Sequence, residues 1–202
     1  MGREFQDQTL HPGHHSIRLK ERDYSAPGFY FITICTHEKK CVLGAIHEGR
    51  MGLSDLGRVV RDCWTEIPGH FVRVKLQGFV IMPNHLHGIV EIWAVGAQHA
   101  APLLGKTSDS GVRPRVEAGS LGAIVRSFKA VVTRLARREF GWKGDIWQRN
   151  YFERVLRDGQ EIADAGRYIA ENPRMWEVDR DNPWKKEKDG STEEGWQGYL
   201  RR

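Results

Sequence analysis

Apolar and β-branched residues gather in short runs that predict strands. Residues 29–36 (FYFITICT) are dense in aromatic and β-branched side chains, which is typical of a buried strand. Residues 41–54 resemble a short hairpin that turns near Glu48-Gly49. The other predicted strands are residues 74–82, 85–93 and 146–156. These runs together favour a sheet built largely from neighbouring antiparallel strands.

Apolar residues recur at helical spacing in three longer segments. The predicted helices are residues 55–67, 121–140 and 159–170. Ser54 or Asp55 is expected to cap the first helix, and Ser120 the second, because short polar side chains accept from free backbone N–H groups there. Pro68-Gly69 is expected to end the first helix. In the second helix the apolar positions are Leu121, Ile124, Val125, Phe128, Val131, Val132 and Leu135.

The order of these elements is strand, hairpin, helix, two strands, helix, strand, helix. It predicts an α+β fold: a ferredoxin-like antiparallel sheet with helices packed on one face. Residues 1–27 are interpreted as a basic N-terminal arm and residues 28–176 as a single domain. Residues 94–119 lack a clear period and are interpreted as a loop insertion, and residues 177–202 as a charged C-terminal tail.

The charge distribution favours a polyanionic partner without identifying one. The 202 residues carry a net charge of +5. The chain from Arg174 onward is neutral, with seven Lys/Arg and seven Asp/Glu, so the basic excess lies in residues 1–173. A solvated protein surface can be equally basic, so this bias alone does not specify nucleic acid.

Cysteine usage and hydropathy bear on location. The three cysteines, Cys35, Cys41 and Cys63, show no CxxC spacing, which argues against a disulfide framework and against a cysteine-rich zinc site. We therefore expect a cytoplasmic protein. The N-terminal residues show neither a secretory signal nor a myristoylation pattern, and no apolar run is long enough for a membrane span, so we expect no membrane partner.

The segment MPNHLHGIV places His85 and His87 two residues apart on a predicted strand. Side chains at i and i+2 of a strand point to the same face, so both imidazoles can be offered to one metal ion. An HxH pair on its own is more often two surface or hydrogen-bonded histidines. A metal would also need a third donor from another segment.

Tyr168 and Asn172 lie one turn apart in the last predicted helix and its end, within RYIAENP. Taken alone, the tyrosine is explained by core packing and the asparagine by a helix C-cap. Taken with the HxH strand, a metal on His85, His87 and Asn172 would lie near the Tyr168 hydroxyl. A nucleophile beside a Lewis acid is what phosphoryl transfer requires.

Four segments carry a family resemblance: MPNHLHGIV, IVRSFKAVVTR, IWQRNYFERVLRD and RYIAENP. In this order the chain resembles the REP-associated tyrosine transposases over about residues 16–176. The resemblance implies a ferredoxin-like catalytic domain of the His-hydrophobic-His nuclease superfamily. It implies His85 and His87 as the metal pair and Tyr168 as the nucleophile, and Asn172 falls where related enzymes place a polar third ligand.

Other residues compete for these roles. Tyr151 is the main alternative nucleophile, and Tyr30 is a further one that its aromatic neighbours favour as packing. His37 follows the first strand and is more simply a surface histidine. The histidines of the arm, which could bind metal but more simply contact DNA as part of a basic segment, are His11, His14 and His15.

Five cationic residues are candidates for DNA contacts. Arg126, Lys129 and Arg137 would form a stripe on the second helix, although a merely solvated face is an equal alternative. Arg149 and Arg154 flank the aromatic pair in the strand that follows and could add phosphate or stacking contacts.

The resemblance leads to an expected activity: cleavage and rejoining of single-stranded, hairpin-bearing DNA through a 5′-phosphotyrosine, with Mg²⁺ or Mn²⁺. The sequence contains no P-loop GxxxxGK[ST], which fits a reaction that needs no ATP. Two alternatives stay open: a non-catalytic DNA-hairpin-binding protein of the same fold, and a metal-dependent phosphoesterase that uses water. The choice between a monomer and a homodimer also stays open.

Overall fold

The computed structural model describes residues 26–94 and 119–185. Its strands are β1 Gly28–Cys35, β2 Gly44–His47, β3 Arg50–Leu53, β4 Val74–Met82, β5 His85–Ile92 and β6 Phe152–Leu156. Its helices are α1 Asp55–Thr65, α2 Ile67–His70, α3 Leu121–Phe140 and α4 Gly159–Glu171, with short 3₁₀ turns η1 His37–Lys39 and η2 Asn172–Val178. The predicted arm and most of the predicted insertion and tail lie outside the described residues. No helix within the described ranges is long and apolar enough to cross a membrane.

Four strands form one antiparallel sheet in the order β4-β5-β1-β6, with β2 and β3 as a separate hairpin. This is the strand order that a βαββαβ ferredoxin-like chain produces, because each helix carries the chain past one strand. The α+β class and the antiparallel sheet are thus confirmed. In the centre of the sheet, β1 pairs with β5 so that Thr33 lies opposite His87 and Cys35 opposite His85.

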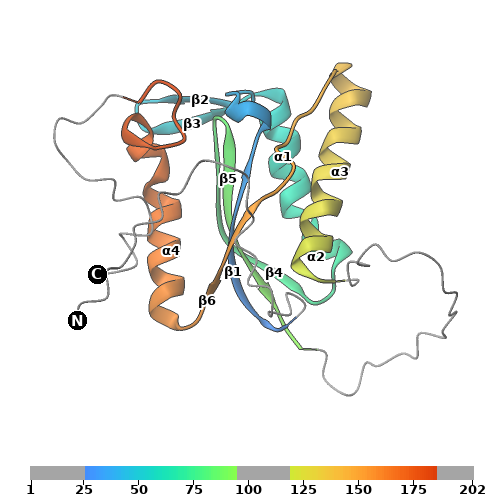
Figure 1. Ribbon diagram of the computed structural model, residues 1–202, viewed down its shortest axis with the longest axis vertical. Helices are drawn as coiled ribbons and strands as arrows, with labels where there is room; N and C mark the ends of the chain where they lie inside the picture. Colours follow the sequence, from blue (N-terminus) through green and yellow to red (C-terminus); the bar gives the residue numbers. More distant parts are fainter. Residues whose placement is uncertain (1–25, 95–118, 186–202) are drawn as a thin grey trace, which may run out of the picture.

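The helices cover both faces of the sheet, with α1 and α3 on one face and α4 on the other (Figure 1). On the α1/α3 face, the buried Ile32, Leu86 and Val90 belong to the same cluster as Trp64 and Phe128, whose rings meet edge-on at 5.3 Å. On the α4 face, Phe31 and Ile89 form a smaller cluster whose helix residues are Ala165 and Ile169.

The prediction that the helices pack on one face is therefore wrong in that detail. β5 is buried at nearly every position and β1 throughout its middle, and both faces of each strand carry apolar side chains. A strand of this kind must be covered on both sides, since apolar area left in water would cost about 25 cal/mol per Å². α4 supplies the second layer.

Local signals place the helix starts correctly and misplace the end of α1. The hydroxyl oxygens of Ser54 and Ser120 accept from the backbone N–H groups of Gly57 and Ala123, so both serines are the N-caps. Pro68-Gly69 does not end α1 but lies within the short α2. Proline is tolerated there because the first turn of a helix has no acceptor for its missing N–H.

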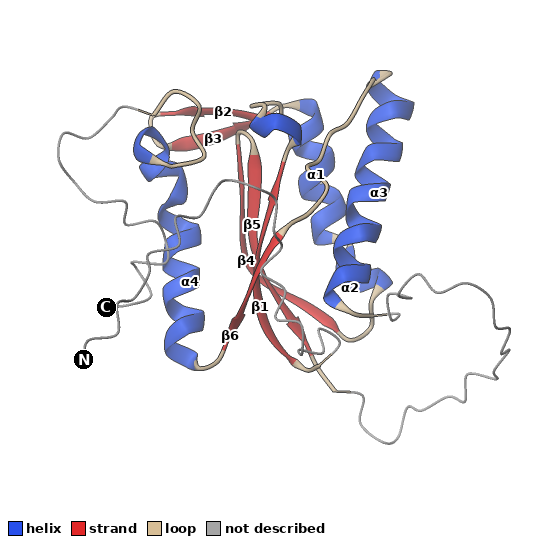
Figure 2. Cartoon of the chain, viewed as in Figure 1, coloured by secondary structure: helices blue, strands red, loops and turns tan. Residues whose placement is uncertain are grey.

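The predicted strand at 146–156 is half as long in the structure. Only Phe152–Leu156 forms β6, and the chain between α3 and β6 is mostly loop (Figure 2). Trp147 makes an isolated bridge with Thr36, and Gln148 donates its N–H to the Cys35 carbonyl. These contacts hold the aromatic residue beside the sheet without a continuous ladder.

Candidate active site

β5 presents His85 and His87 on the α4 face of the sheet, while Leu86 between them enters the core under α1 and α3. The two imidazole rings are 4.5 Å apart between centroids. Both are buried, with 0% and 3% of their surface exposed. The alternation of the strand therefore brings the two rings together, as the HxH spacing predicts.

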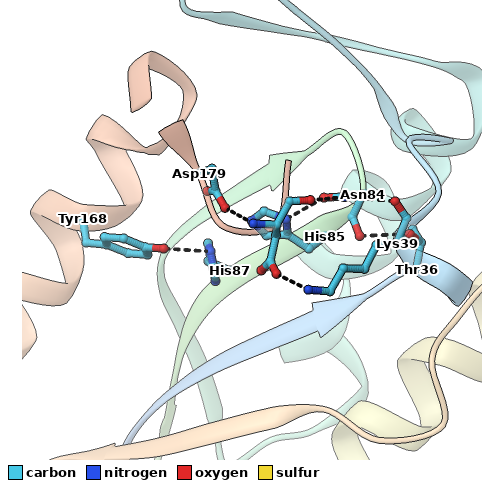
Figure 3. Close-up of polar contacts among 8 residues, drawn as sticks. Thr36, Lys39, Asn84, His85, His87, Tyr168 and Asp179 are labelled. Carbon is cyan, nitrogen blue, oxygen red and sulfur yellow. Dashed lines mark hydrogen bonds and ion pairs between the residues drawn. The ribbon is translucent and has the colours of Figure 1, made fainter. Parts of the chain in front are cut away.

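Each histidine uses its Nδ1 for a hydrogen bond within the protein. His85 Nδ1 lies 2.8 Å from Asn84 Oδ1 (Figure 3). His87 Nδ1 lies 2.8 Å from Thr33 Oγ1 on the neighbouring β1. Histidines that bind metals commonly anchor one ring nitrogen in this way and ligate with the other. In both rings the nitrogen left for a ligand is Nε2.

Tyr168 reaches this site from α4, the helix that covers the sheet face of the two histidines. Its hydroxyl oxygen lies 3.3 Å from His87 Nε2, and the two ring centroids are 5.2 Å apart (Figure 3). The ring packs edge-on against Phe31 at 6.0 Å. α4 is held at this position by Ala165 and Ile169, which are buried against the sheet.

Asn172 follows at the end of α4, with 2% of its surface exposed. Within the part of the chain that the structure describes, its Oδ1 and His85 Nε2 are both buried and have no hydrogen-bond partner. Leaving a buried polar atom unpaired costs about 1–3 kcal/mol, so such atoms usually have a functional reason. Two of the three predicted metal ligands thus carry lone pairs that nothing described in the protein satisfies.

The donors gathered here are imidazole nitrogens and an amide oxygen. Among residues 26–94 and 119–185, no three His, Cys, Asp or Glu side chains form a group suited to a metal ion. A site made of His85, His87 and Asn172 would be neutral and have two nitrogen ligands. Such a mixed set of donors could hold a divalent ion such as Mg²⁺ or Mn²⁺.

Burial keeps both histidines in the form that can bind a metal. Burial lowers the pKa of His85 to about 4, and the cations Lys39 and Arg180 act in the same direction, while Asp181 opposes them. Burial, with the neighbouring His85 and Arg180, lowers the pKa of His87 well below its ordinary value. Both rings are therefore neutral at physiological pH.

The Tyr168 phenol is held protonated by the protein alone. Burial raises its pKa to about 12, and the Asp179 carboxylate adds to the rise. The Asn172 side chain and the Arg180 guanidinium act in the opposite direction. A phenolate here needs additional positive charge close to its oxygen.

The segment after η2 also packs against this site, which sequence reasoning missed. Asn84 Nδ2 donates to the Asp181 carbonyl at 2.6 Å, and the Asp181 carboxylate lies 2.6 Å from Lys39 Nζ. The Asp181 N–H donates in turn to Asp179 Oδ1 at 2.7 Å. Asp179 and Asp181 were assigned to the charged tail because that segment shows no periodic pattern. Only their contacts with distant residues reveal that they pack against the site.

The rival tyrosines lie elsewhere. Tyr30 is fully buried in the cluster on the α1/α3 face, where its hydroxyl donates to the Ala26 carbonyl at 2.7 Å. Tyr151 packs against the same cluster. His37 is half-exposed and lies 3.6 Å from Glu38. The histidines predicted to contact DNA from the arm lie outside the described residues.

The five cationic candidates do not form one surface. Arg126, Arg137 and Arg149 are exposed, but the first two belong to α3, on the sheet face opposite the histidines. Lys129 Nζ donates to the carbonyls of Gln148 and Asn150, so it holds the loop before β6. The structure thus does not show the stripe predicted for α3.

Arg154 is the cationic candidate on the sheet face of the histidines. It lies opposite Phe31 in the β1–β6 register, and Phe31 contacts the His87 ring at 5.3 Å between centroids. Its guanidinium is 3.1 Å from Glu161 of α4. This ion pair joins β6 to α4 beside the site.

Comparisons with known proteins agree with this architecture. No family model matches the chain. An uncharacterised protein of Haemophilus influenzae (strain ATCC 51907 / DSM 11121 / KW20 / Rd) is 44% identical over 170 residues, which cover 83% of this chain and 93% of that protein. The solved structure of a REP-associated tyrosine transposase bound to a REP hairpin aligns with a TM-score of 0.50 and 16% identity, over 82% of this chain and 74% of that one. A structure from Deinococcus radiodurans R1 aligns with a TM-score of 0.42, too low to support a fold assignment.

The fold is therefore that of a REP-associated tyrosine transposase, as the sequence motifs predict. By its sequence, the chain belongs to the family of the Haemophilus influenzae protein.

Proposed function

We propose that this protein is a metal-dependent transposase of single-stranded DNA that cleaves and rejoins strands through a 5′-phosphotyrosine on Tyr168. One observation carries the proposal: the Tyr168 hydroxyl oxygen lies 3.3 Å from His87 Nε2. The unpartnered His85 Nε2 and Asn172 Oδ1 of the described chain support it as further donors.

His85, His87 and Asn172 would hold the ion, Mg²⁺ or Mn²⁺. When bound, the ion would supply Lewis-acid polarisation of the scissile phosphate and favour the Tyr168 phenolate. The positions of the two histidines are fixed by β5, and that of Tyr168 by the packing of α4. Rigid elements on both sides suit a reaction that depends on the alignment of nucleophile and phosphate.

Tyr168 performs the covalent step. Its oxygen attacks the phosphorus and loses its proton to solvent, while the bond from phosphorus to the 3′ oxygen breaks. The products are a 5′-phosphotyrosine and a free 3′-hydroxyl. A 3′-hydroxyl of another strand then attacks the same phosphorus, and Tyr168 leaves. One phosphodiester is exchanged for another, so the reaction requires no nucleotide cofactor.

The proposed substrate is DNA with a hairpin. The similar solved transposase is bound to a REP hairpin, which supports a hairpin oligonucleotide as the first substrate to test. Whether the protein acts as a monomer or a homodimer does not affect this test.

The experiment incubates purified protein with end-labelled hairpin oligonucleotides and Mn²⁺, and then denatures the mixture. We expect a protein–DNA adduct that survives denaturation, and we expect Tyr168→Phe to abolish it. Tyr151→Phe is the matched control and should form the adduct, because Tyr151 packs on the other face of the sheet. An adduct formed by Tyr168→Phe would contradict the assignment of the nucleophile.

One observation favours a second function. The raised pKa of Tyr168 suits a phenol that only packs or donates a hydrogen bond, with a metal-bound water as the nucleophile of a phosphoesterase. Repeated turnover of the oligonucleotide without any adduct would support that reaction. Hairpin binding with neither cleavage nor adduct would support a non-catalytic DNA-binding protein.

A further inference from the structure

Asn84, at the turn between β4 and β5, uses every polar atom of its side chain. It is fully buried, and its Nδ2 donates to the carbonyls of Lys39 at 3.0 Å and Asp181 at 2.6 Å. Its Oδ1 lies 2.8 Å from His85 Nδ1. The amide has two N–H groups and one acceptor oxygen, so these three contacts account for all of its principal hydrogen-bonding capacity.

The two carbonyl partners fix the orientation of the amide. Carbonyls only accept, so the Asn84 nitrogen must face Lys39 and Asp181. A flipped amide would set its oxygen against two carbonyl oxygens and lose both hydrogen bonds. The oxygen is therefore the atom that faces His85.

The orientation of Asn84 then selects the tautomer of His85. An amide oxygen only accepts, so His85 Nδ1 must carry the proton. In a neutral imidazole the other nitrogen, Nε2, then has a lone pair instead of a proton. This is the buried Nε2 for which the described residues supply no partner.

His87 differs from His85 in this respect. Its Nδ1 partner is the Thr33 hydroxyl, which can donate as well as accept. Asn84 thus fixes the tautomer of His85. The Thr33 hydroxyl can rotate to donate or accept, so it does not fix the tautomer of His87.

The same amide also joins two distant segments at the site. Lys39 belongs to η1 and has a positive φ of 51°, and Asp181 lies beyond η2. The side chains of Lys39 and Asp181 also form an ion pair, so the two segments contact each other as well as Asn84 (Figure 3). Displacing the Asn84 amide would therefore disturb η1 and the segment at Asp181 together.

We propose that Asn84 is a positioning residue: it fixes His85 in the Nδ1–H tautomer and so presents the Nε2 lone pair at the active site. The part of this inference that concerns metal affinity rests on the proposed function, while the tautomer of metal-free His85 does not. Partners behind metal-binding histidines typically change metal affinity about 10–100-fold when they are removed.

The test begins with the metal-free full-length chain, labelled with ¹⁵N-histidine. Two-bond ¹H–¹⁵N correlation spectra at neutral pH report which ring nitrogen is protonated, and His85→Gln assigns the His85 signals. We expect a protonated Nδ1 and an unprotonated Nε2 in the wild type. A protonated Nε2 would overturn the proposal without any variant of Asn84.

Four variants then separate the amide from its surroundings. Asn84→Ala should release His85 from the single Nδ1–H tautomer and weaken Mn²⁺ binding about 10–100-fold. Asn84→Asp keeps an acceptor oxygen for His85 and should keep a proton on Nδ1, although it loses both hydrogen bonds to the Lys39 and Asp181 carbonyls. Lys39→Met removes only the ion pair to Asp181, and Thr33→Val only the partner of His87, so both should leave the His85 tautomer unchanged.

Retention of the Nδ1–H tautomer and of Mn²⁺ affinity within about twofold in Asn84→Ala would overturn the proposal. If Asn84→Ala does not fold, the wild-type spectrum decides alone, and an unprotonated Nδ1 in His85 would overturn the proposal. A wild type with the expected tautomer that binds no Mn²⁺ would support the role of Asn84 in setting the tautomer. The same result would contradict the metal dependence of the proposed function.

Discussion

The hydroxyl oxygen of Tyr168 lies 3.3 Å from Nε2 of His87, although 81 residues separate them in the chain. One residue belongs to a helix and the other to a central strand, and their rings also pack against each other, with centroids 5.2 Å apart. The nitrogen that faces the phenol is also the one left for a metal after Thr33 has taken Nδ1. The proposed nucleophile and the proposed metal site are thus adjacent but separable.

Tyr168→Phe is expected to remove the covalent adduct and to leave Mn²⁺ affinity within about twofold. The phenylalanine ring can keep the edge-on contact with Phe31, and only the oxygen is lost. Isothermal titration of the purified variant measures the affinity. A loss of tenfold or more would mean that the phenol itself is a ligand of the ion.

Asn172→Ala should weaken Mn²⁺ binding by about tenfold, equivalent to about 1.4 kcal/mol, because an oxygen donor is removed. The same change deletes a buried oxygen with no partner in the described chain, but it also removes the hydrogen bond of the Asn172 side chain to Tyr168, so the folded fraction of the variant is matched to the wild type before the affinities are compared. Asn172→Asp is the matched control and should retain binding, because it keeps an oxygen at the same position. Unaltered Mn²⁺ affinity in Asn172→Ala would exclude it as a ligand.

The metal-free protein should lose stability as the pH falls below the ordinary histidine pKa of about 6.5. His85 in the folded state has a pKa of about 4, so between these values the unfolded chain binds a proton that the folded chain does not. The free energy of unfolding should then fall by up to about 1.4 kcal/mol per pH unit for this residue, and the fall should level off below its folded pKa. Denaturant unfolding across this range measures the slope. His85→Gln should show a shallower slope, and an identical slope would contradict the burial of a neutral His85.

Lys129→Met should lower the free energy of unfolding by about 1–3 kcal/mol, because the carbonyls of Gln148 and Asn150 lose their donor. Arg126→Met, on the exposed side of the same helix, should change it by no more than about 0.5 kcal/mol. Chemical denaturation compares the two. A larger loss of hairpin affinity in Lys129→Met than in Arg126→Met, at equal folded fraction, would restore Lys129 as a DNA contact.

Gly88→Ala should destabilise the fold by about 3 kcal/mol, because a Cβ at Gly88 would lie 2.4 Å from Cζ2 of the buried Trp64 ring. Gly166→Ala in α4 is the control, since a Cβ there would meet nothing within 4 Å. It should stabilise the protein by up to about 1 kcal/mol through helix propensity. Equal melting temperatures for the two variants would contradict the close packing of α1 on β5.

The local pattern of the sequence was sufficient for most of the elements. The helical spacing of α3 and its Ser120 cap placed that helix, because capping and amphipathicity act within a few residues. The alternation in β5 predicted that His85 and His87 share a face, for the same reason. Helical spacing paired Tyr168 with Asn172, the family resemblance implied Tyr168 as the nucleophile, and the structure brings its hydroxyl to His87.

The tertiary structure decided what depends on segments far apart in the chain. Runs that are apolar on both sides did not reveal which helix covers which face, so the position of α4 was mispredicted. The sequence left Lys129 as a DNA contact or a solvated cation, whereas in the structure its Nζ donates to the Gln148 carbonyl. Asn84 and Asp181 carried no signal in the sequence, because a hydrogen bond across 97 residues leaves no local period. The sequence by itself determined the elements and the type of site, and the packing of distant segments decided which side chains complete it.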